Sequence, residues 1–172
     1  MVKSNLQQTE NWYLLYTNPR AEKKVKIELD YKGFHSFLPL QKIQKQWSDR
    51  KKWVEEPLFK SYIFIKTSLE KNYYNILNTP GIVKFVSFEN KPVLVNEKHI
   101  QTIELLLGNF ENIETEPYEP VIGDMIEIIA GPLTGIQAKL LSCQGKHHVF
   151  LEMPEIMQNI KLQLPINYIK PI

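Results

Sequence analysis

Residues 57–66, with the sequence PLFKSYIFIK, contain a short apolar and aromatic run between two boundary signals. Pro57 precedes the run, and Thr67 and Ser68 follow it as a signal for the start of a helix. Runs of this kind are typical of a strand in the centre of a sheet. The stretch therefore predicts a buried central strand, with apolar positions at Leu58, Phe59, Tyr62, Ile63, Phe64 and Ile65.

Residues 12–17, WYLLYT, predict a first strand that also lies centrally, because both of its faces are apolar. Asn18 and Pro19 then have the residue types of an N-cap and a first helical position. The spacing predicts a helix over residues 20–31 that ends at Gly33. Its wet side is expected to carry Arg20, Glu22, Lys23, Lys24, Lys26 and Glu28.

A second strand is expected over residues 34–43, and a basic hairpin over residues 42–53. Ser48 and Asp49 supply the turn of this hairpin. Two interpretations stay open for it: a solvated hairpin whose tryptophans pack on its own stem, or a contact for nucleic acid or a partner. The residues concerned are Lys42, Lys45, Arg50, Lys51 and Lys52, interleaved with Trp47 and Trp53.

The rest of the front part alternates helices with short strands. Helical spacing is found over residues 68–78 and 97–107, and residues 82–88 and 92–95 have the pattern of two strands joined by a turn. The order β-α-β-β-β-α-β-β-α predicts an α+β sandwich with an antiparallel sheet and helices packed on it.

Residues 108–120 have four Glu, two Pro and no hydrophobic period, which predicts an extended acidic linker. Four short apolar strands separated by glycine and proline turns follow, and they predict a small β-barrel over residues 121–172. The sequence thus predicts a loose tail over residues 1–10, one α+β domain over residues 11–107, and a second domain after the linker.

The two parts differ in charge. Residues 1–107 hold 17 Lys and Arg against 11 Asp and Glu, and residues 108–172 hold 4 against 8. The formal charge of +6 over residues 1–107 is compatible with a function close to nucleic acid. The formal charge of −4 over residues 108–172 makes that part a poor candidate for binding phosphates.

Two motifs resemble those of the NusG family of transcription elongation factors. Pro-Leu-Phe-x-x-Tyr-Ile-Phe-Ile at residues 57–65 resembles the signature strand of the family's N-terminal (NGN) domain. Residues 121–135, VIGDMIEIIAGPLTG, resemble its KOW motif, in which Gly131 and Gly135 allow positive φ. Ala138 stands where a further glycine is usual, and Lys60-Ser61 where Pro-Gly or Pro-Asn is frequent. Within the family, the sequences of the first strand and of the signature strand are more similar to specialised, operon-dedicated paralogues of the RfaH, LoaP and UpxY type than to the general factor.

The resemblance implies a binding function on bacterial RNA polymerase that suppresses pausing or termination on a dedicated set of long operons. The clamp coiled coil of the largest polymerase subunit is then expected to contact an aromatic depression, and the second large subunit the helix near residues 72–75. Aromatic side chains suit such a contact because they bury a large area at small entropic cost. The positions implied for polymerase binding are Tyr16, Phe59, Tyr62, Phe64 and Phe88, with Tyr73 and Tyr74 on the helix.

Nucleic acid, either the non-template DNA strand or nascent RNA, is the second implied partner. Arg20, Lys23 and Lys24 are implied to face it, and Lys45, Arg50, Lys51 and Lys52 of the hairpin are further candidates. The KOW domain is implied to recruit a ribosomal protein or a termination factor. Pro154 and Pro165 interrupt any second helix there, so a stable barrel is expected rather than a helical hairpin.

Catalysis finds no support in the sequence. The four histidines are scattered, no phosphate-binding loop is present, and the lone Cys143 has no partner for a disulfide or a zinc site. We expect a cytoplasmic monomer without cofactor, metal or membrane segment. The alternative function that stays open is a general RNA-binding or ribosome-associated KOW protein, in which the basic hairpin binds RNA and polymerase binding is absent.

Overall fold

The computed structural model describes residues 9–47, 49–119, 121–143 and 146–172. Residues 1–8 of the tail predicted over residues 1–10 and the turn residue Ser48 lie outside these ranges, as does the side chain of Cys143. The chain divides into two compact units. Unit 1 comprises residues 1–38 and 59–96, and unit 2 comprises residues 39–58 and 97–172.

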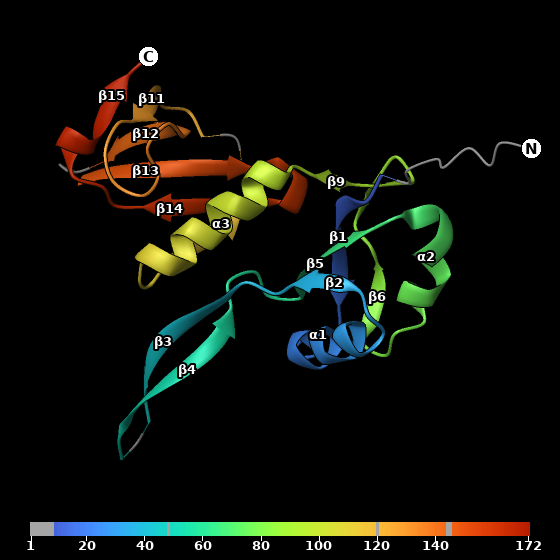
Figure 1. Ribbon diagram of the computed structural model, residues 1–172. Helices are drawn as coiled ribbons and strands as arrows, with labels where there is room; N and C mark the ends of the chain where they lie inside the picture. The colour runs from blue at the N-terminus through green and yellow to red at the C-terminus, as the bar shows by residue number, and fades with distance from the viewer. Residues whose placement is uncertain (1–8, 48, 120, 144–145) are drawn as a thin grey trace, which may run out of the picture. The chain divides into compact units, whose positions relative to one another are not determined.

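Unit 1 is built on a five-stranded sheet with the order β2-β5-β1-β6, to which β9 adds as a further partner of β1 (Figure 1). Strand β1 pairs antiparallel with three neighbours, so its predicted central position is confirmed. Strand β5 lies between β2 and β1, which confirms a central strand for this part of the chain. The bounds are β1 Asn11–Thr17, β2 His35–Phe37, β5 Tyr62–Thr67, β6 Ile82–Phe85 and β9 Leu94–Val95.

The strand predicted over residues 57–66 begins later than expected, at Tyr62. A turn precedes it, in which the backbone N–H of Tyr62 reaches the carbonyl of Phe59 at 3.4 Å and Ser61 has a φ of 65°. Positive φ is incompatible with a continuous strand. The apolar run is therefore split between a turn and a strand.

Helix α1 (Glu22–Tyr31) and helix α2 (Leu69–Leu77) belong to unit 1. Helix α1 starts four residues after the predicted N-cap Asn18. Asn18 instead accepts a hydrogen bond from the N–H of Ala21 at 3.1 Å, in a turn that holds Arg20 at a φ of 64°. Helix α2 begins after Ser68 as predicted.

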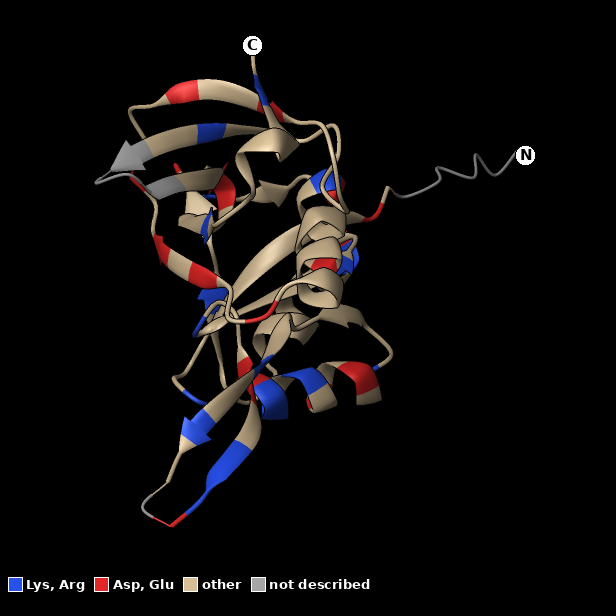
Figure 2. Ribbon diagram, turned by 90° about the vertical axis from the view of Figure 1, so that its left-hand side faces the viewer, with Lys and Arg blue, Asp and Glu red and all other residues tan. Residues whose placement is uncertain are grey.

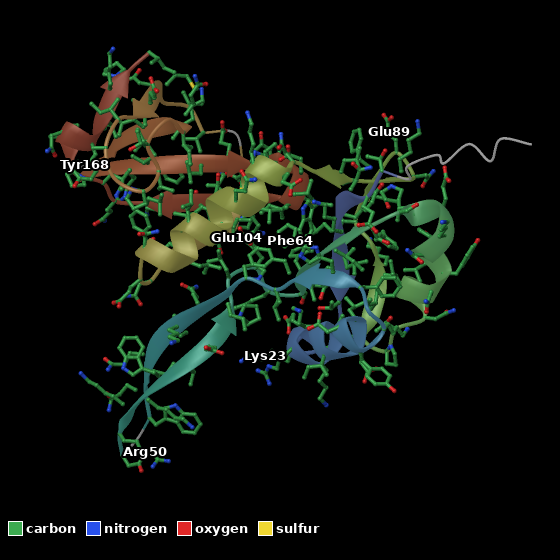
Figure 3. The ribbon with its side chains drawn as sticks, in the orientation of Figure 1. Lys23, Arg50, Phe64, Glu89, Glu104 and Tyr168 are labelled. Atoms are coloured by element: carbon green, nitrogen blue, oxygen red, sulfur yellow. The ribbon has the colours of Figure 1, made fainter. Side chains whose placement is uncertain are left out.

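A short hairpin closes unit 1 at the predicted turn, but the two continuous strands predicted over residues 82–88 and 92–95 are wrong, because each is broken after a few residues and β6 and β9 pair with β1 instead. Strand β7 (Ser87–Phe88) pairs with β8 (Lys91–Pro92) through Glu89 and Asn90, both of which have positive φ. Two consecutive positive φ angles are the mark of a tight hairpin turn. Glu89 lies at this turn in Figure 3.

In unit 2, strands β3 (Leu40–Gln46) and β4 (Lys51–Pro57) pair over seven positions to form a two-stranded ribbon. This confirms the predicted hairpin. The single strand predicted over residues 34–43 is wrong, because β2 ends at Phe37 and β3 begins at Leu40. Pro39 lies at the break, and proline has no N–H to donate to a sheet.

Helix α3 (Glu97–Asn109) buries Ile100, Ile103 and Leu106 as the periodicity predicts. The stretch after it is extended but is not an unpaired linker throughout. Strand β10 (Glu114–Pro117) pairs with β14, and the N–H of Ile113 donates to the Gln41 side chain at 3.1 Å. The two glutamates of this strand, Glu114 and Glu116, do not prevent pairing, because they alternate along the strand and both are exposed.

The remaining strands complete a six-stranded antiparallel sheet with the order β10-β14-β13-β12-β11-β15. They confirm strands, and no helical hairpin, over the described residues from 124 to 162. Gly131 and Gly135 have φ of 81° and 87°, as the KOW-like motif predicts. Gly123 is required because a Cβ there would lie 2.4 Å from the backbone carbonyl oxygen of Leu140. The bounds are β11 Asp124–Ile128, β12 Gln137–Cys143, β13 Lys146–Met153, β14 Gln158–Leu162 and β15 Ile169–Pro171.

The architecture is the α+β class with antiparallel sheets that the sequence predicts. Of the helices described, none is both long and apolar enough to cross a membrane.

Candidate binding surfaces

Tyr16 and Tyr62 form a pair of aromatic rings on the sheet of unit 1. They stand directly opposite each other on β1 and β5, with ring centroids 5.5 Å apart and planes at 63°. Both side chains are half-buried. An edge-to-face pair of this kind presents two rigid amphipathic rings to whatever covers them. Of the residues predicted for polymerase binding, the structure brings these two together at a partly open position.

The turn before Tyr62 is held by two other elements of unit 1. The carbonyl of Ser61 accepts a hydrogen bond from the N–H of Thr17 at 2.8 Å. The N–H of Ser61 donates to the carboxylate of Glu22 at 2.7 Å. Glu22 is only 5% exposed, so its predicted place on the wet side of α1 is wrong. The reason is that the turn has a backbone donor that needs an acceptor, a requirement that helical periodicity does not contain.

Phe59 and Phe64 lie next to each other, with ring centroids 6.2 Å apart. Both are buried, Phe59 at 2% and Phe64 at 0% exposure. The ring of Phe64, which is labelled in Figure 3, also lies next to that of Phe37 of β2, with centroids 5.9 Å apart. Phe59 and Phe64 are therefore core residues of unit 1, and the predicted polymerase contact does not reach their buried rings directly.

Phe88 lies apart from the tyrosine pair. Phe85 stands opposite Leu15, and the N–H of Val86 donates to Leu14, so the chain then runs toward the start of β1 while Tyr16 lies near its end. Phe88 itself is 72% exposed. The sequence gives no signal for this separation because it depends on the direction of β6 along β1.

The two tyrosines predicted on α2 have different environments. Tyr73 stacks on Phe85 with centroids 5.0 Å apart and planes at 14°, which makes it part of the packing between α2 and the sheet. Tyr74 is 77% exposed and meets the edge of Tyr73 at 5.3 Å. Tyr74 is thus the more exposed of the two, whereas Tyr73 is half-buried.

The electrostatics of the tyrosine pair favour the neutral phenol. Burial raises the pKa of the Tyr62 hydroxyl above its ordinary value of 10.0, and the adjacent Tyr16 raises it further. Removing a charged form from water is unfavourable, and two phenolates would repel each other. Tyr62 is therefore a neutral hydrogen-bonding group at physiological pH.

The predicted cations of unit 1 lie around the start of α1. Arg20, in the turn, and Lys23 and Lys24, in the first turns of the helix, are all exposed. The side chain of Lys23 is marked in Figure 3. The next lysine, Lys26, pairs with Asp30 one turn on at 2.5 Å. Exposure allows these cations to meet phosphates but does not by itself select them.

The predicted cations of the ribbon lie toward its turn (Figure 2). Lys45 stands directly opposite Lys52, and Gln46 opposite Lys51. Lys45 pairs with Glu56, whereas no carboxylate among the described residues pairs with Lys51 or Lys52. The guanidinium of Arg50, at the far end of the ribbon in Figure 3, lies 4.0 Å from the carboxylate of the neighbouring Asp49. Trp47 and Trp53 are each 55% exposed.

Within the described ranges, no three His, Cys, Asp or Glu side chains gather as a metal site would need. The surfaces that remain are made of aromatic rings and cations. Aromatic rings and cations are groups that protein interfaces and nucleic-acid contacts commonly use.

Comparison with known proteins gives one family. Residues 10–104 match a family described as "Transcription termination factor nusG". Proteins named "Transcription termination/antitermination protein NusG" are similar over most of their length. That of Lactococcus lactis is 23% identical over 149 residues, 79% of this chain and 80% of its own. That of Rickettsia prowazekii is 28% identical over 148 residues, which cover 76% of this chain and 71% of its own length. That of Bacillus subtilis is 25% identical over 160 residues, which cover 84% of this chain and 89% of its own length.

Among solved structures, one described as "Domain interaction in Thermotoga maritima NusG" superposes with a TM-score of 0.58. The match covers 95% of this chain and 97% of the other at 21% sequence identity. At that identity the likeness concerns the fold alone.

Proposed function

The protein belongs to the NusG family of transcription termination and antitermination factors, and on this premise we propose that it binds bacterial RNA polymerase through unit 1. The contact is made by the Tyr16–Tyr62 pair on the clamp coiled coil of the largest subunit. Its effect is to suppress pausing or termination on a dedicated set of long operons, as in the specialised paralogues of the family. No covalent chemistry is involved.

One observation supports this contact above the others: two half-exposed tyrosine rings meet at 5.5 Å on a rigid sheet. Their backbones are fixed by strand pairing, and the turn before Tyr62 is tied to β1 and to Glu22. Little entropy is lost when such preorganised rings are covered, and a few aromatic anchors usually dominate the affinity of an interface. Phe59 and Phe64 are buried in the core of unit 1 and are not part of the proposed contact.

Further contacts follow from the same premise. Exposed Tyr74 on α2 is proposed to meet the second large subunit, and Arg20, Lys23 and Lys24 the non-template DNA strand. We retain the proposal that residues 11–107 act as the NGN-like domain and residues 121–172 as a KOW domain for a ribosomal protein or termination factor. We place this work in the cytoplasm, with the protein as a monomer.

The test is the affinity of the full chain for purified bacterial core RNA polymerase at near-physiological salt. We expect Tyr62→Ala and Tyr16→Ala each to weaken binding by roughly 2 kcal/mol, about thirtyfold. Tyr31→Ala is the matched control, since it removes a ring that is 90% exposed on α1 and outside the proposed contact. Phe59 and Phe64 are unsuitable probes because truncating a buried ring also destabilises the fold.

Equal losses in all three variants would sink the proposed contact. If wild type binds neither core polymerase nor a paused elongation complex, the polymerase proposal fails as a whole. The alternative of a general RNA-binding or ribosome-associated protein then takes its place.

A further inference from the structure

The outer part of the β3–β4 ribbon combines exposed tryptophan rings, which water solvates poorly, with a cluster of cations that repel one another. Of residues 44–53, every one that the structure describes is exposed. They include two tryptophans, each 55% exposed, and four cations against one carboxylate, that of Asp49. The cations are Lys45, Arg50, Lys51 and Lys52.

Charge repulsion within the ribbon adds to the cost of exposing the tryptophan rings. Lys45 and Lys52 are a directly opposed pair, and like charges at such positions destabilise a hairpin. A two-stranded ribbon has little stability of its own. The nearest compensation is Glu56, which pairs with Lys45 and leaves Lys51 and Lys52 without a carboxylate among the described residues. The cluster is therefore arranged to receive negative charge from outside.

The tryptophans distinguish this cluster from an ordinary solvated face. Trp53 stands opposite Gln44, and Lys51 lies two residues before it on the same face of β4. Beside it is a hollow of about 630 Å³ lined by Lys42, Trp53, Val54, Glu55 and Glu111. Trp47 lies just beyond the end of β3, and its backbone N–H donates to the backbone carbonyl of Arg50 across the turn at 2.8 Å. Each tryptophan is 55% exposed and lies within three residues of a cation along the ribbon.

From this arrangement we propose that the ribbon binds single-stranded nucleic acid. Unpaired bases stack on the faces of Trp47 and Trp53, while Arg50, Lys51 and Lys52 meet the phosphates. Proteins that hold single strands without strict sequence preference combine these two groups, because every base has a flat face and every nucleotide a charge. Paired bases in a duplex offer neither tryptophan a face to stack on. The proposal does not depend on the polymerase contact, which uses residues of unit 1.

The experiment measures binding of the full chain to fluorescent oligonucleotides: single-stranded RNA, single-stranded DNA, and the matching duplexes. We expect Trp47→Ala and Trp53→Ala each to weaken single-strand binding about tenfold, and Trp53→Phe to retain most of it. Tyr31→Ala is the control for loss of an exposed ring. Trp12, which is 5% exposed, reports by its fluorescence that each variant is folded.

A charge arm completes the test. Lys51→Gln with Lys52→Gln is compared with Lys71→Gln and Lys170→Gln, two exposed lysines outside the ribbon. Only the ribbon pair should reduce the salt dependence, by about 1.4 in the slope of log affinity against log salt. A preference for RNA identifies the nascent transcript as the ligand, and a preference for DNA identifies the displaced strand; either supports the proposal.

Three results would overturn it. Duplex could bind as tightly as single strands, the alanine variants could match wild type, or the two lysine pairs could behave alike. If ribbon variants lose polymerase binding while oligonucleotide binding is unchanged, a protein occupies the ribbon and the proposal is wrong.

Discussion

The Tyr62 hydroxyl carries the clearest protonation signal among the described residues. Its pKa is raised by burial first and by Tyr16 second, so the folded protein holds the phenolic proton more tightly than the unfolded chain does. A group with a raised folded pKa adds stability below its unfolded pKa and loses it as the pH rises through the folded value. The window of interest therefore opens near pH 10, the ordinary tyrosine value.

We expect Tyr62→Phe to leave the free energy of unfolding nearly unchanged at pH 7 and to flatten its decline above pH 10. The variant keeps the ring that meets Tyr16 and removes only the titrating oxygen. Urea unfolding at pH steps from 7 to 11.5 measures both arms. Parallel curves for wild type and variant across that range would show that the hydroxyl is not held in its neutral form by the fold.

At the scale of elements, Glu22 connects helix α1 to the turn that delivers strand β5. Its carboxylate accepts the N–H of Ser61 in a nearly buried position. We expect Glu22→Ala to cost about 1–3 kcal/mol of unfolding free energy, because a buried donor loses its acceptor. Glu22→Gln keeps an acceptor oxygen of the same reach and should cost clearly less. Urea unfolding at pH 7 ranks the two variants.

The Glu22→Ala and Glu22→Gln variants also show whether Glu22 positions the turn for binding as well as stabilising the fold. At a temperature where both variants are folded, Glu22→Ala should also weaken polymerase binding, since the turn before Tyr62 loses one of its two ties. If Ala and Gln prove equally destabilising, the charge of Glu22 matters more than the hydrogen bond to Ser61, and the positioning role is wrong.

These elements also show what the sequence can predict and where it stops. Strand β1, helix α2 and the β3–β4 ribbon follow from periodicity and local turn residues, which act within a few positions. The turn at Ser61 and the buried place of Glu22 do not, because they depend on a hydrogen bond that spans 39 positions of the chain. The separation of Phe88 from Tyr16 is likewise invisible in the sequence, because it depends on the direction in which β6 runs along β1.

The paired state of β10 illustrates a further limit. Glutamates and prolines over residues 108–120 predict an extended acidic chain, and the backbone is indeed extended over Glu114–Pro117. Pairing with β14 adds what composition cannot show, a neighbour whose free edge is available only after the sheet has formed.

At the scale of the whole molecule, the question is whether the C-terminal region, residues 121–172, has one stable fold. The described residues of β11 to β14 form antiparallel strands in a single sheet, with Ile126, Val149 and Ile160 fully buried. A helical alternative would put Pro154 inside a helix, where its ring and missing N–H cost about 3 kcal/mol. Met157, at a φ of 55°, ends the short turn between β13 and β14 in a conformation that a helix interior does not contain.

We therefore expect the free full-length protein, without polymerase or nucleic acid, to show strand-type backbone chemical shifts throughout β11, β12, β13 and β14. Helix α3 is the internal reference, since the same spectrum must give helical shifts there. Helical shifts across the described residues between 137 and 162 would contradict the prediction. They would mean that this region is helical in the free protein and changes to strands only when a partner binds. Strand shifts mean that the surface offered by the six-stranded sheet exists before any partner arrives, so that recruitment requires binding and no change of fold.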